Sequence, residues 1–200
     1  PGSLRRTIGR PTLSTDSPTK APFVYYYSPK YRLEQVYDNE TMPFDHWAEF
    51  GFSESGESFI DKITRLDFFV TDFDCVANNG CDLPTGSALS LTVTYALQDC
   101  TIQSRTHGAY TDGDFSQVAS ITFPPDVFLT RIEYTSEFVT ICNSNSDCIN
   151  VDPHNGTKSG VVFEKNNSVI KALHGSSGSW LDAVGVYYEP YGQSTSTCGF

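Results

Sequence analysis

The residues with the most specific chemistry in this 200-residue chain form one short, glycine-opened turn, Gly178-Ser179-Trp180-Leu181-Asp182. Glycine allows a tight backbone turn or the close approach of a ligand. The Asp182 carboxylate can accept hydrogen bonds from two adjacent hydroxyl groups, and charge-assisted hydrogen bonds are among the stronger ones. Backbone N–H groups of Trp180 and Leu181 would donate to the same hydroxyls, and the Trp180 ring would offer an apolar face. This set of groups suits a neutral, polyhydroxylated ligand, for which the protein must replace hydrogen bonds to water.

Each of these residues also has a structural interpretation. Asp182 would serve equally as a turn aspartate whose carboxylate accepts from nearby backbone N–H groups. Trp180 would serve equally by packing. The turn alone therefore leaves a ligand site and ordinary turn chemistry as alternatives.

Catalytic chemistry has little support in the sequence. The histidines show no metal-ligand spacing, and the zinc pattern C-x₂-C is absent. No G-x-S-x-G nucleophile turn occurs. We predict a protein that is not an enzyme and needs no metal or cofactor. The histidines are His46, His107, His154 and His174.

The six cysteines suggest three disulfide bonds. Cys75 with Cys81 and Cys142 with Cys148 would each close a short polar loop, which leaves Cys100 and Cys198 to pair. Six cysteines allow fifteen pairings, so this connectivity is a prediction from proximity alone. An even cysteine count favours an oxidising compartment.

Charge and sequons limit the partners and the location. The net charge of −11 disfavours nucleic acid and anionic lipid as partners. No apolar run reaches the length that spans a bilayer, so we predict no membrane insertion. Three Asn-x-Ser/Thr sequons, together with the cysteines, predict a secreted or cell-surface glycoprotein. The sequon residues are Asn39, Asn155 and Asn166.

The elements that must position the turn are strands. Runs of alternating apolar and polar residues, such as 63–70, 87–97 and 128–134, are separated by Gly, Asn, Asp and Pro. This pattern is typical of an all-β domain. Residues 1–22 are expected to form a flexible leader, 23–50 an aromatic arm packed on the domain, and 191–200 a tail pinned by Cys198.

Residues 174–188, His-Gly-Ser-Ser-Gly-Ser-Trp-Leu-Asp-Ala-Val-Gly-Val-Tyr-Tyr, resemble the last hairpin of the jacalin-related lectins over about fifteen positions. Gly56-Glu-Ser-Phe59-Ile-Asp61 resembles the Gly-x-x-Phe-Asp-Asp opening of that family. The resemblance covers about residues 51–190.

The resemblance implies a β-prism of three four-stranded Greek-key sheets around a common core, with the first and last strands paired. It implies a sugar site at one end of the prism, formed by the Gly178–Asp182 turn, a glycine near the first strand and a further loop. Gly56 and Thr135 are the candidates for the last two. The family often has a Gly-Gly pair where this chain has Ser55-Gly56, and this departure favours an ordinary turn glycine at position 56 over a sugar contact.

The resemblance implies a secreted carbohydrate-binding module whose partners are glycans or glycoproteins. Galactose-preferring members expose a free amino terminus at the opening glycine, whereas Gly56 follows fifty-five residues. We therefore expect a mannose or glucose preference. The alternative is a sugar-inactive β-prism that binds a protein at the cell surface. An open Asp182 would favour the first function, and an end covered by the arm would favour the second.

Overall fold

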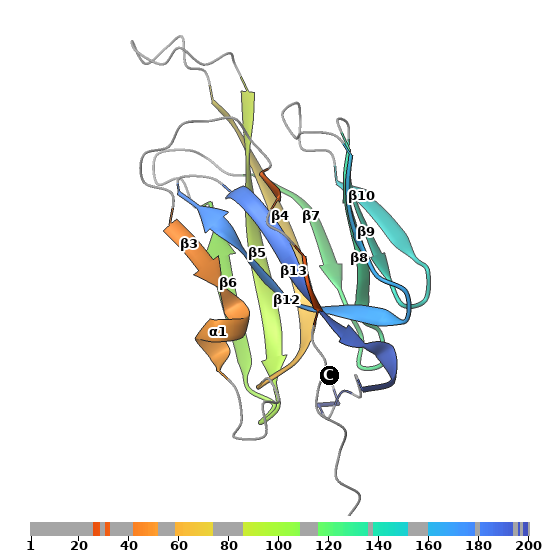
Figure 1. Ribbon diagram of the computed structural model, residues 1–200. Helices are drawn as coiled ribbons and strands as arrows, with labels where there is room; N and C mark the ends of the chain where they lie inside the picture. The colour runs from red at the N-terminus through yellow and green to blue at the C-terminus, as the bar shows by residue number, and fades with distance from the viewer. Residues whose placement is uncertain are drawn as a thin grey trace, which may run out of the picture.

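The computed structural model describes residues 26–28, 31–32, 42–51, 59–73, 86–108, 116–135, 138–151, 160–178, 181–193, 196 and 198–199 (Figure 1). The expected leader, residues 1–22, lies outside the described residues. Within the described part of the chain, no helix has the length and apolar character needed to cross a bilayer.

Strands make up almost all of the described structure. The only helical elements among the described residues are one five-residue α-helix and one 3₁₀ turn. The elements are β1 (Tyr26–Tyr27), β2 (Tyr31–Arg32), β3 (Met42–Asp45), α1 (His46–Phe50), β4 (Ile60–Phe73), β5 (Gly86–Leu97), β6 (Ile102–His107), β7 (Ser116–Thr122), β8 (Leu129–Tyr134), β9 (Val139–Asn143), β10 (Cys148–Val151), β11 (Val161–Glu164), β12 (Ser168–Ser177), β13 (Leu181–Pro190) and η1 (Tyr191–Gln193).

The strands form three antiparallel sheets, as a β-prism requires. Two sheets have four strands each, in the orders β6-β5-β4-β7 and β10-β9-β8-β11. In both, three consecutive strands are followed by a fourth that returns beside the first, which is the Greek-key arrangement. The third sheet has the order β1-β13-β12-β3, with β2 also paired to β13. The predicted all-β, three-sheet fold is thus confirmed.

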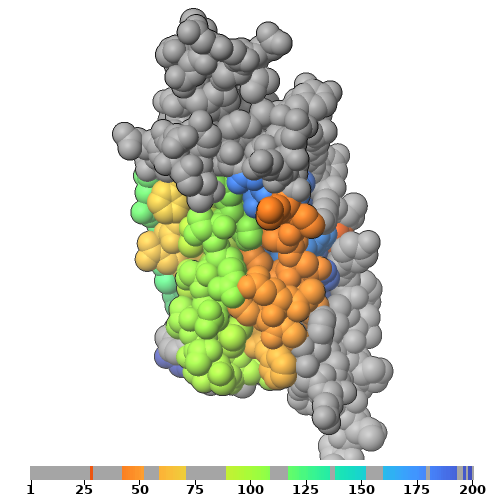
Figure 2. Space-filling view, turned by 90° about the vertical axis from the view of Figure 1, so that its left-hand side faces the viewer, coloured from red at the N-terminus to blue at the C-terminus, as the bar shows by residue number. Residues whose placement is uncertain are grey.

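Strands from the predicted aromatic arm are part of the third sheet. β1 and β2 lie end to end along β13, pairing Tyr27 with Tyr187 and Tyr31 with Val184, so together they take the place of one strand. β3 pairs with the other strand of the hairpin, β12. Figure 2 shows β3 and α1, in orange, forming one continuous surface with the green residues of β5 and β6. The prism therefore includes residues well before position 51, because backbone pairing joins this segment to the last hairpin.

The core fills the space between the three sheets. Alternate residues of each long strand point inward, and their side chains are almost completely buried. They include Leu66 and Phe68 of β4, Val93 and Tyr95 of β5, Ile132 and Tyr134 of β8, and Leu173 and Val184 of the last hairpin. Burial of this kind contributes about 1.5–3 kcal/mol per large apolar side chain, so it holds the three sheets together.

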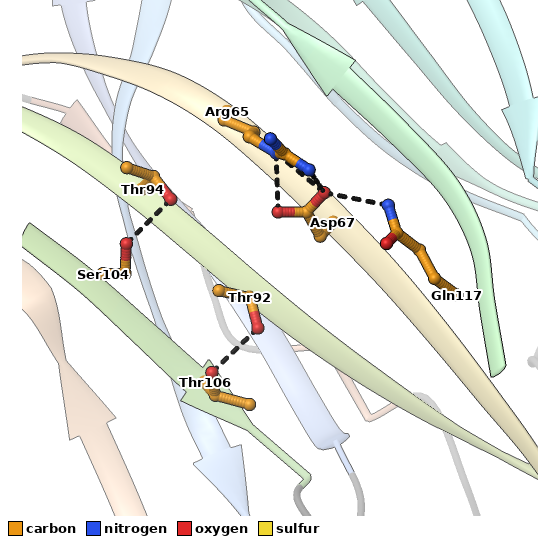
Figure 3. A network of polar contacts seen from close by, with 7 residues as sticks. All are labelled: Arg65, Asp67, Thr92, Thr94, Ser104, Thr106 and Gln117. Atoms are coloured by element: carbon orange, nitrogen blue, oxygen red, sulfur yellow. Dashed lines mark hydrogen bonds and ion pairs between the residues drawn. The ribbon is translucent and has the colours of Figure 1, made fainter. Parts of the chain in front are cut away.

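The outward face of the β6-β5-β4-β7 sheet is polar, and its side chains pair with one another (Figure 3). Thr92 bonds to Thr106 at 2.8 Å, and Thr94 bonds to Ser104 at 2.9 Å. Arg65 donates to Asp67, which lies two residues further along the same strand, β4, at 2.8 Å. The same strands therefore follow the apolar-in, polar-out alternation seen in the sequence.

Two of the three predicted disulfides lie among the described residues, and both are formed. Cys142 pairs with Cys148 across the β9–β10 turn, and Cys100 pairs with Cys198 over 98 residues. The second bond attaches the chain after η1 to the turn between β5 and β6. Cys75 and Cys81 lie outside the described residues.

Candidate functional site

The predicted site turn joins β12 to β13 at one end of the prism, which we call the hairpin end. Ser177 pairs with Leu181, whereas Ser168 pairs with Pro190 about 30 Å away at the opposite end of the same two strands. The hairpin end is the upper end in Figure 1, and the chain terminus marked C lies at the lower end. Gly178 is a bend residue of intermediate exposure. Ser179 and Trp180 lie outside the described residues.

Asp182 is the extra residue of a β-bulge at the start of β13. Ser177 pairs with Leu181 and Ser176 with Ala183, so one residue of β13 is inserted between these two pairs. Bulges bend a strand and re-aim side chains, and they are frequent beside functional sites. The Leu181 side chain enters the core with no exposed surface, and Asp182 is only 5% exposed. The bulge thus directs Asp182 differently from the alternating residues around it.

Two glycines of the hairpin are required by close contacts. A Cβ on Gly175 would lie 2.0 Å from the Ala183 carbonyl oxygen and 2.7 Å from the Phe44 ring. A Cβ on Gly185 would lie 2.4 Å from the ring of His174. Gly175 therefore lets Phe44 of β3 pack closely on the hairpin, and Gly185 leaves room for the His174 ring.

A chain of hydrogen bonds runs beneath the hairpin end. The Leu173 N–H donates to the Tyr95 hydroxyl at 3.3 Å, and that hydroxyl lies 2.5 Å from His46 Nδ1. His46 Nε2 lies 2.6 Å from His107 Nε2, and His107 Nδ1 lies 3.3 Å from the Ser177 hydroxyl. The donors in the three imidazole contacts depend on which ring nitrogens carry the protons. In the arrangement that gives the Tyr95 proton an acceptor, Tyr95 donates to His46, His46 to His107 and His107 to Ser177. This series of hydrogen bonds ends at Ser177, the residue before Gly178.

His46 and His107 are both neutral at physiological pH. Burial lowers the pKa of His46 to about 3, helped by the nearby His107 and Arg105. Burial, together with Arg105, lowers the pKa of His107 to about 4. In a hydrogen bond between two ring nitrogens, one nitrogen must be unprotonated so that it can accept. Protonation of either imidazole would therefore remove an acceptor and break one hydrogen bond of the series.

Sequence reasoning did not find this pair, because 61 residues separate His46 from His107. The two nitrogens bind each other, and no group of three or more metal-ligating side chains occurs among the residues that the structure describes. The arrangement is therefore that of a buried structural network, which supports the base of the turn.

Thr135 lies at the hairpin end, because β8 begins at the opposite end and runs toward Tyr134. Thr135 closes the turn to β9. Its N–H donates to the Phe138 carbonyl at 2.8 Å, and its hydroxyl accepts from the Phe138 N–H at 2.8 Å. The structure thus brings the loop of Thr135 and the Gly178–Asp182 turn to the same end of the prism.

Gly56 lies outside the described residues, but the Phe59 N–H donates to the Gly51 carbonyl, which holds the two flanks of its segment together. Ser177 contacts His107, which pairs with Leu91 of β5, and Leu91 pairs with Phe68 of β4. Phe68 lies nine residues along the chain from Phe59. That span is roughly 25–30 Å. The contribution of Gly56 to the site therefore stays a prediction.

The strands on the two sides of the last hairpin, β2 and β3, each have one end at the hairpin end. β2 ends with Arg32 beside Ala183, and β3 begins with Met42 beside Ser177. The strands on the two sides of the hairpin are thus joined by residues 33–41, which lie outside the described residues.

This arrangement is the fold of the jacalin-related lectins. The structure matches Malaysian banana lectin with a TM-score of 0.51 at 12% sequence identity, over 84% of this chain and 99% of that one. It matches a mannose-binding jacalin-related lectin from Ananas comosus with a TM-score of 0.51 at 16% identity, over 84% and 99% of the two chains. It matches artocarpin, in a complex with mannotriose, with a TM-score of 0.50 at 13% identity and the same coverage.

The structural matches cover a larger share of this chain than the sequence resemblance does. Residues 51–190 are 140 of 200 residues, or 70%, whereas the structural matches cover 84% of the chain. By sequence alone, no family model and no curated protein matches this chain. The likeness therefore resides in the fold.

Proposed function

We propose that this protein is a glycan-binding module whose site lies at the hairpin end. The observation that carries the proposal is the β-bulge that sets Asp182 apart at the tip of the last hairpin, in a fold shared with lectins. Asp182 would accept from two sugar hydroxyls, and the backbone of residues 178–181 would donate to them. Ser179, Trp180 and Thr135 would complete the site.

A preference for mannose or glucose is the finer part of this proposal. The Ananas comosus lectin is described as mannose-binding, and artocarpin was solved with mannotriose. Both have the fold of this chain, and this likeness supports the same class of sugar here. Glycans and glycoproteins are then the partners.

A glycan array with two charge-matched variants tests the proposal. Asp182→Asn removes the carboxylate charge at the hairpin end, and Asp126→Asn removes one from an exposed position at the opposite end. We expect the wild type and Asp126→Asn to bind the same mannose-containing set. Asp182→Asn should lose about 10- to 100-fold in affinity, because hydrogen bonds to a charged group contribute about 1.5–3 kcal/mol. Folded wild-type protein that binds no glycan would refute the proposal.

The burial of Asp182 favours a second candidate. A carboxylate that is 5% exposed offers little surface to a sugar in this conformation. A β-prism that binds a protein at the cell surface, without reading sugar, is consistent with that burial, since fold does not fix function. The same array separates the two, because a protein-binding module would leave it blank while retaining a folded structure by circular dichroism.

We further propose that the domain functions outside the cell. Disulfides form and persist in oxidising compartments, and the two described bonds support this location. Peptide mapping without reduction should recover both bonds from secreted protein. It should also join Cys75 to Cys81, and finding either of these as a free thiol would contradict the third predicted bond.

A further inference from the structure

A polar pocket of about 280 Å³ lies at the end of the prism opposite the hairpin turn. It is bounded by the β9–β10 turn, by the turn between β11 and β12, and by the start of η1. Its lining includes Asn143 and Ser146 from the first turn, Asn166 and Asn167 from the second, and Tyr191 from η1. The volume lies just below the range typical of pockets for drug-sized ligands, so it suits one small ring.

The walls of the pocket are held firmly. The Cys142–Cys148 disulfide closes the β9–β10 turn, and the Asn143 side-chain oxygen accepts from Asn145 N–H at 2.9 Å and Asp147 N–H at 3.0 Å. Across the pocket, the Tyr191 N–H donates to the Asn167 carbonyl at 2.8 Å. A ligand would therefore meet a preformed site and pay little ordering entropy.

The groups that face this pocket suit an amide-bearing sugar. Tyr191 is 47% exposed, and its ring is fixed edge-on against Phe128 with centroids 6.0 Å apart. Within the described part of the chain, the side chains of Asn166, Asn167 and Tyr191 make no hydrogen bond, so their donors and acceptors can be used by a ligand. An exposed ring beside side-chain amides presents an apolar face and paired donors and acceptors to a pyranose.

One residue of the lining begins a sequon, Asn166-Asn167-Ser168. Asn166 is exposed in a tight turn, closed by the Ser168 N–H donating to the Lys165 carbonyl at 3.2 Å. A sugar attached to Asn166 would start at the wall of the pocket. Asn39 and Asn155, the other two sequon residues, lie outside the described residues.

We propose that Asn166 carries an N-linked glycan and that its first N-acetylglucosamine lies in this pocket against Tyr191. The Asn166 amide nitrogen loses a proton and forms a bond to C1 of the sugar. The bond from C1 to the phosphate of a lipid-linked diphospho-oligosaccharide donor breaks, and the lipid diphosphate leaves. This proposal concerns the end of the prism away from Asp182, so it stands independently of the proposed function.

The test uses the full chain secreted from eukaryotic cells. Mass spectrometry should find Asn166 occupied. Enzymatic release of this glycan from the native protein should be about ten-fold faster in Tyr191→Ala than in the wild type, because the ring no longer shields the first sugar. Tyr191→Phe keeps the ring and should release like the wild type. Phe138→Ala removes an exposed ring at the hairpin end and should also behave like the wild type.

Thermal stability gives a second measurement that does not depend on the enzyme used for release. Glycosylated wild type should melt several degrees above Asn166→Gln, and this difference should vanish when Tyr191→Ala is present in both. Asp182→Asn should change neither the release rate nor this difference. An unoccupied Asn166 in secreted protein, or a release rate that is the same with and without the Tyr191 ring, would overturn the proposal.

Discussion

The paired imidazoles of His46 and His107 make the stability of this protein dependent on pH. Both pKa values are lowered in the folded state, to about 3 and about 4, from an ordinary value of 6.5. As pH falls below 6.5, the unfolded chain binds protons that the folded chain does not, so the free energy of unfolding falls. The stability that neutral histidines contribute is thus present above pH 6.5 and is lost as pH approaches the folded-state values.

Urea titration at a series of pH values measures this effect. Between pH 6.5 and 5 we expect the free energy of unfolding to fall by about 1–2 kcal/mol for each of the two histidines. In His107→Asn one of the two titrating groups is gone, so about half of this decrease should remain. An equal decrease in the variant and the wild type would show that these histidines are not its source.

Residue-level chemistry was only partly predictable from the sequence. The Gly178–Asp182 turn was found because all its residues are adjacent in the chain. His46, Tyr95 and His107 could not be found in this way, since three different elements bring them together. The burial of Asp182 could not be foreseen either, because it depends on a bulge that shifts the register of β13 by one residue.

At the level of elements, the packing of the last hairpin depends on its glycines, Gly175 and Gly185. Gly175 lies against both the Ala183 carbonyl and the Phe44 ring, so it fixes the distance between β3, β12 and β13. The glycines of this hairpin were visible in the sequence. Their reason was not, because Phe44 comes from a segment expected to lie outside the prism.

Gly175→Ala should therefore destabilise the protein by about 2–4 kcal/mol, since the new methyl group would overlap backbone that cannot move freely. Gly192→Ala is the matched control, because a Cβ there meets nothing within 4 Å. It should change stability by less than about 0.5 kcal/mol. Chemical denaturation of both variants measures the difference, and a Gly175→Ala protein as stable as the wild type would show that β3 does not pack as described.

At the level of the whole molecule, the described strands of the prism extend back to residue 26. The sequence predicted three sheets and the last hairpin, because strand alternation and the hairpin motif are local signals. It did not predict β1 and β2, because they are two residues each and pair with a strand more than 150 residues away. Such pairings leave no periodic signal in the chain.

A truncated chain that begins at Gly51 should therefore fail to fold, although it contains the whole predicted lectin domain. It would lack both strands that flank the last hairpin, together with the buried Trp47 and His46. A chain that begins at Phe23 keeps all described strands and should fold. Dispersion of amide proton signals distinguishes the two outcomes, and a well-dispersed spectrum from the shorter chain would show that β1–β3 are dispensable.

The bond between Cys100 and Cys198 also determines how the domain would respond to mechanical tension. A pull on the chain beyond Cys198 passes through this bond to the turn between β5 and β6, bypassing β6 to β13. The two cysteines are 98 positions apart in the sequence, which corresponds to about 34 nm of extended chain. This length cannot be stretched while the bond is intact. A reducing agent would release that length, so the redox state of one bond sets how far the domain can extend under load.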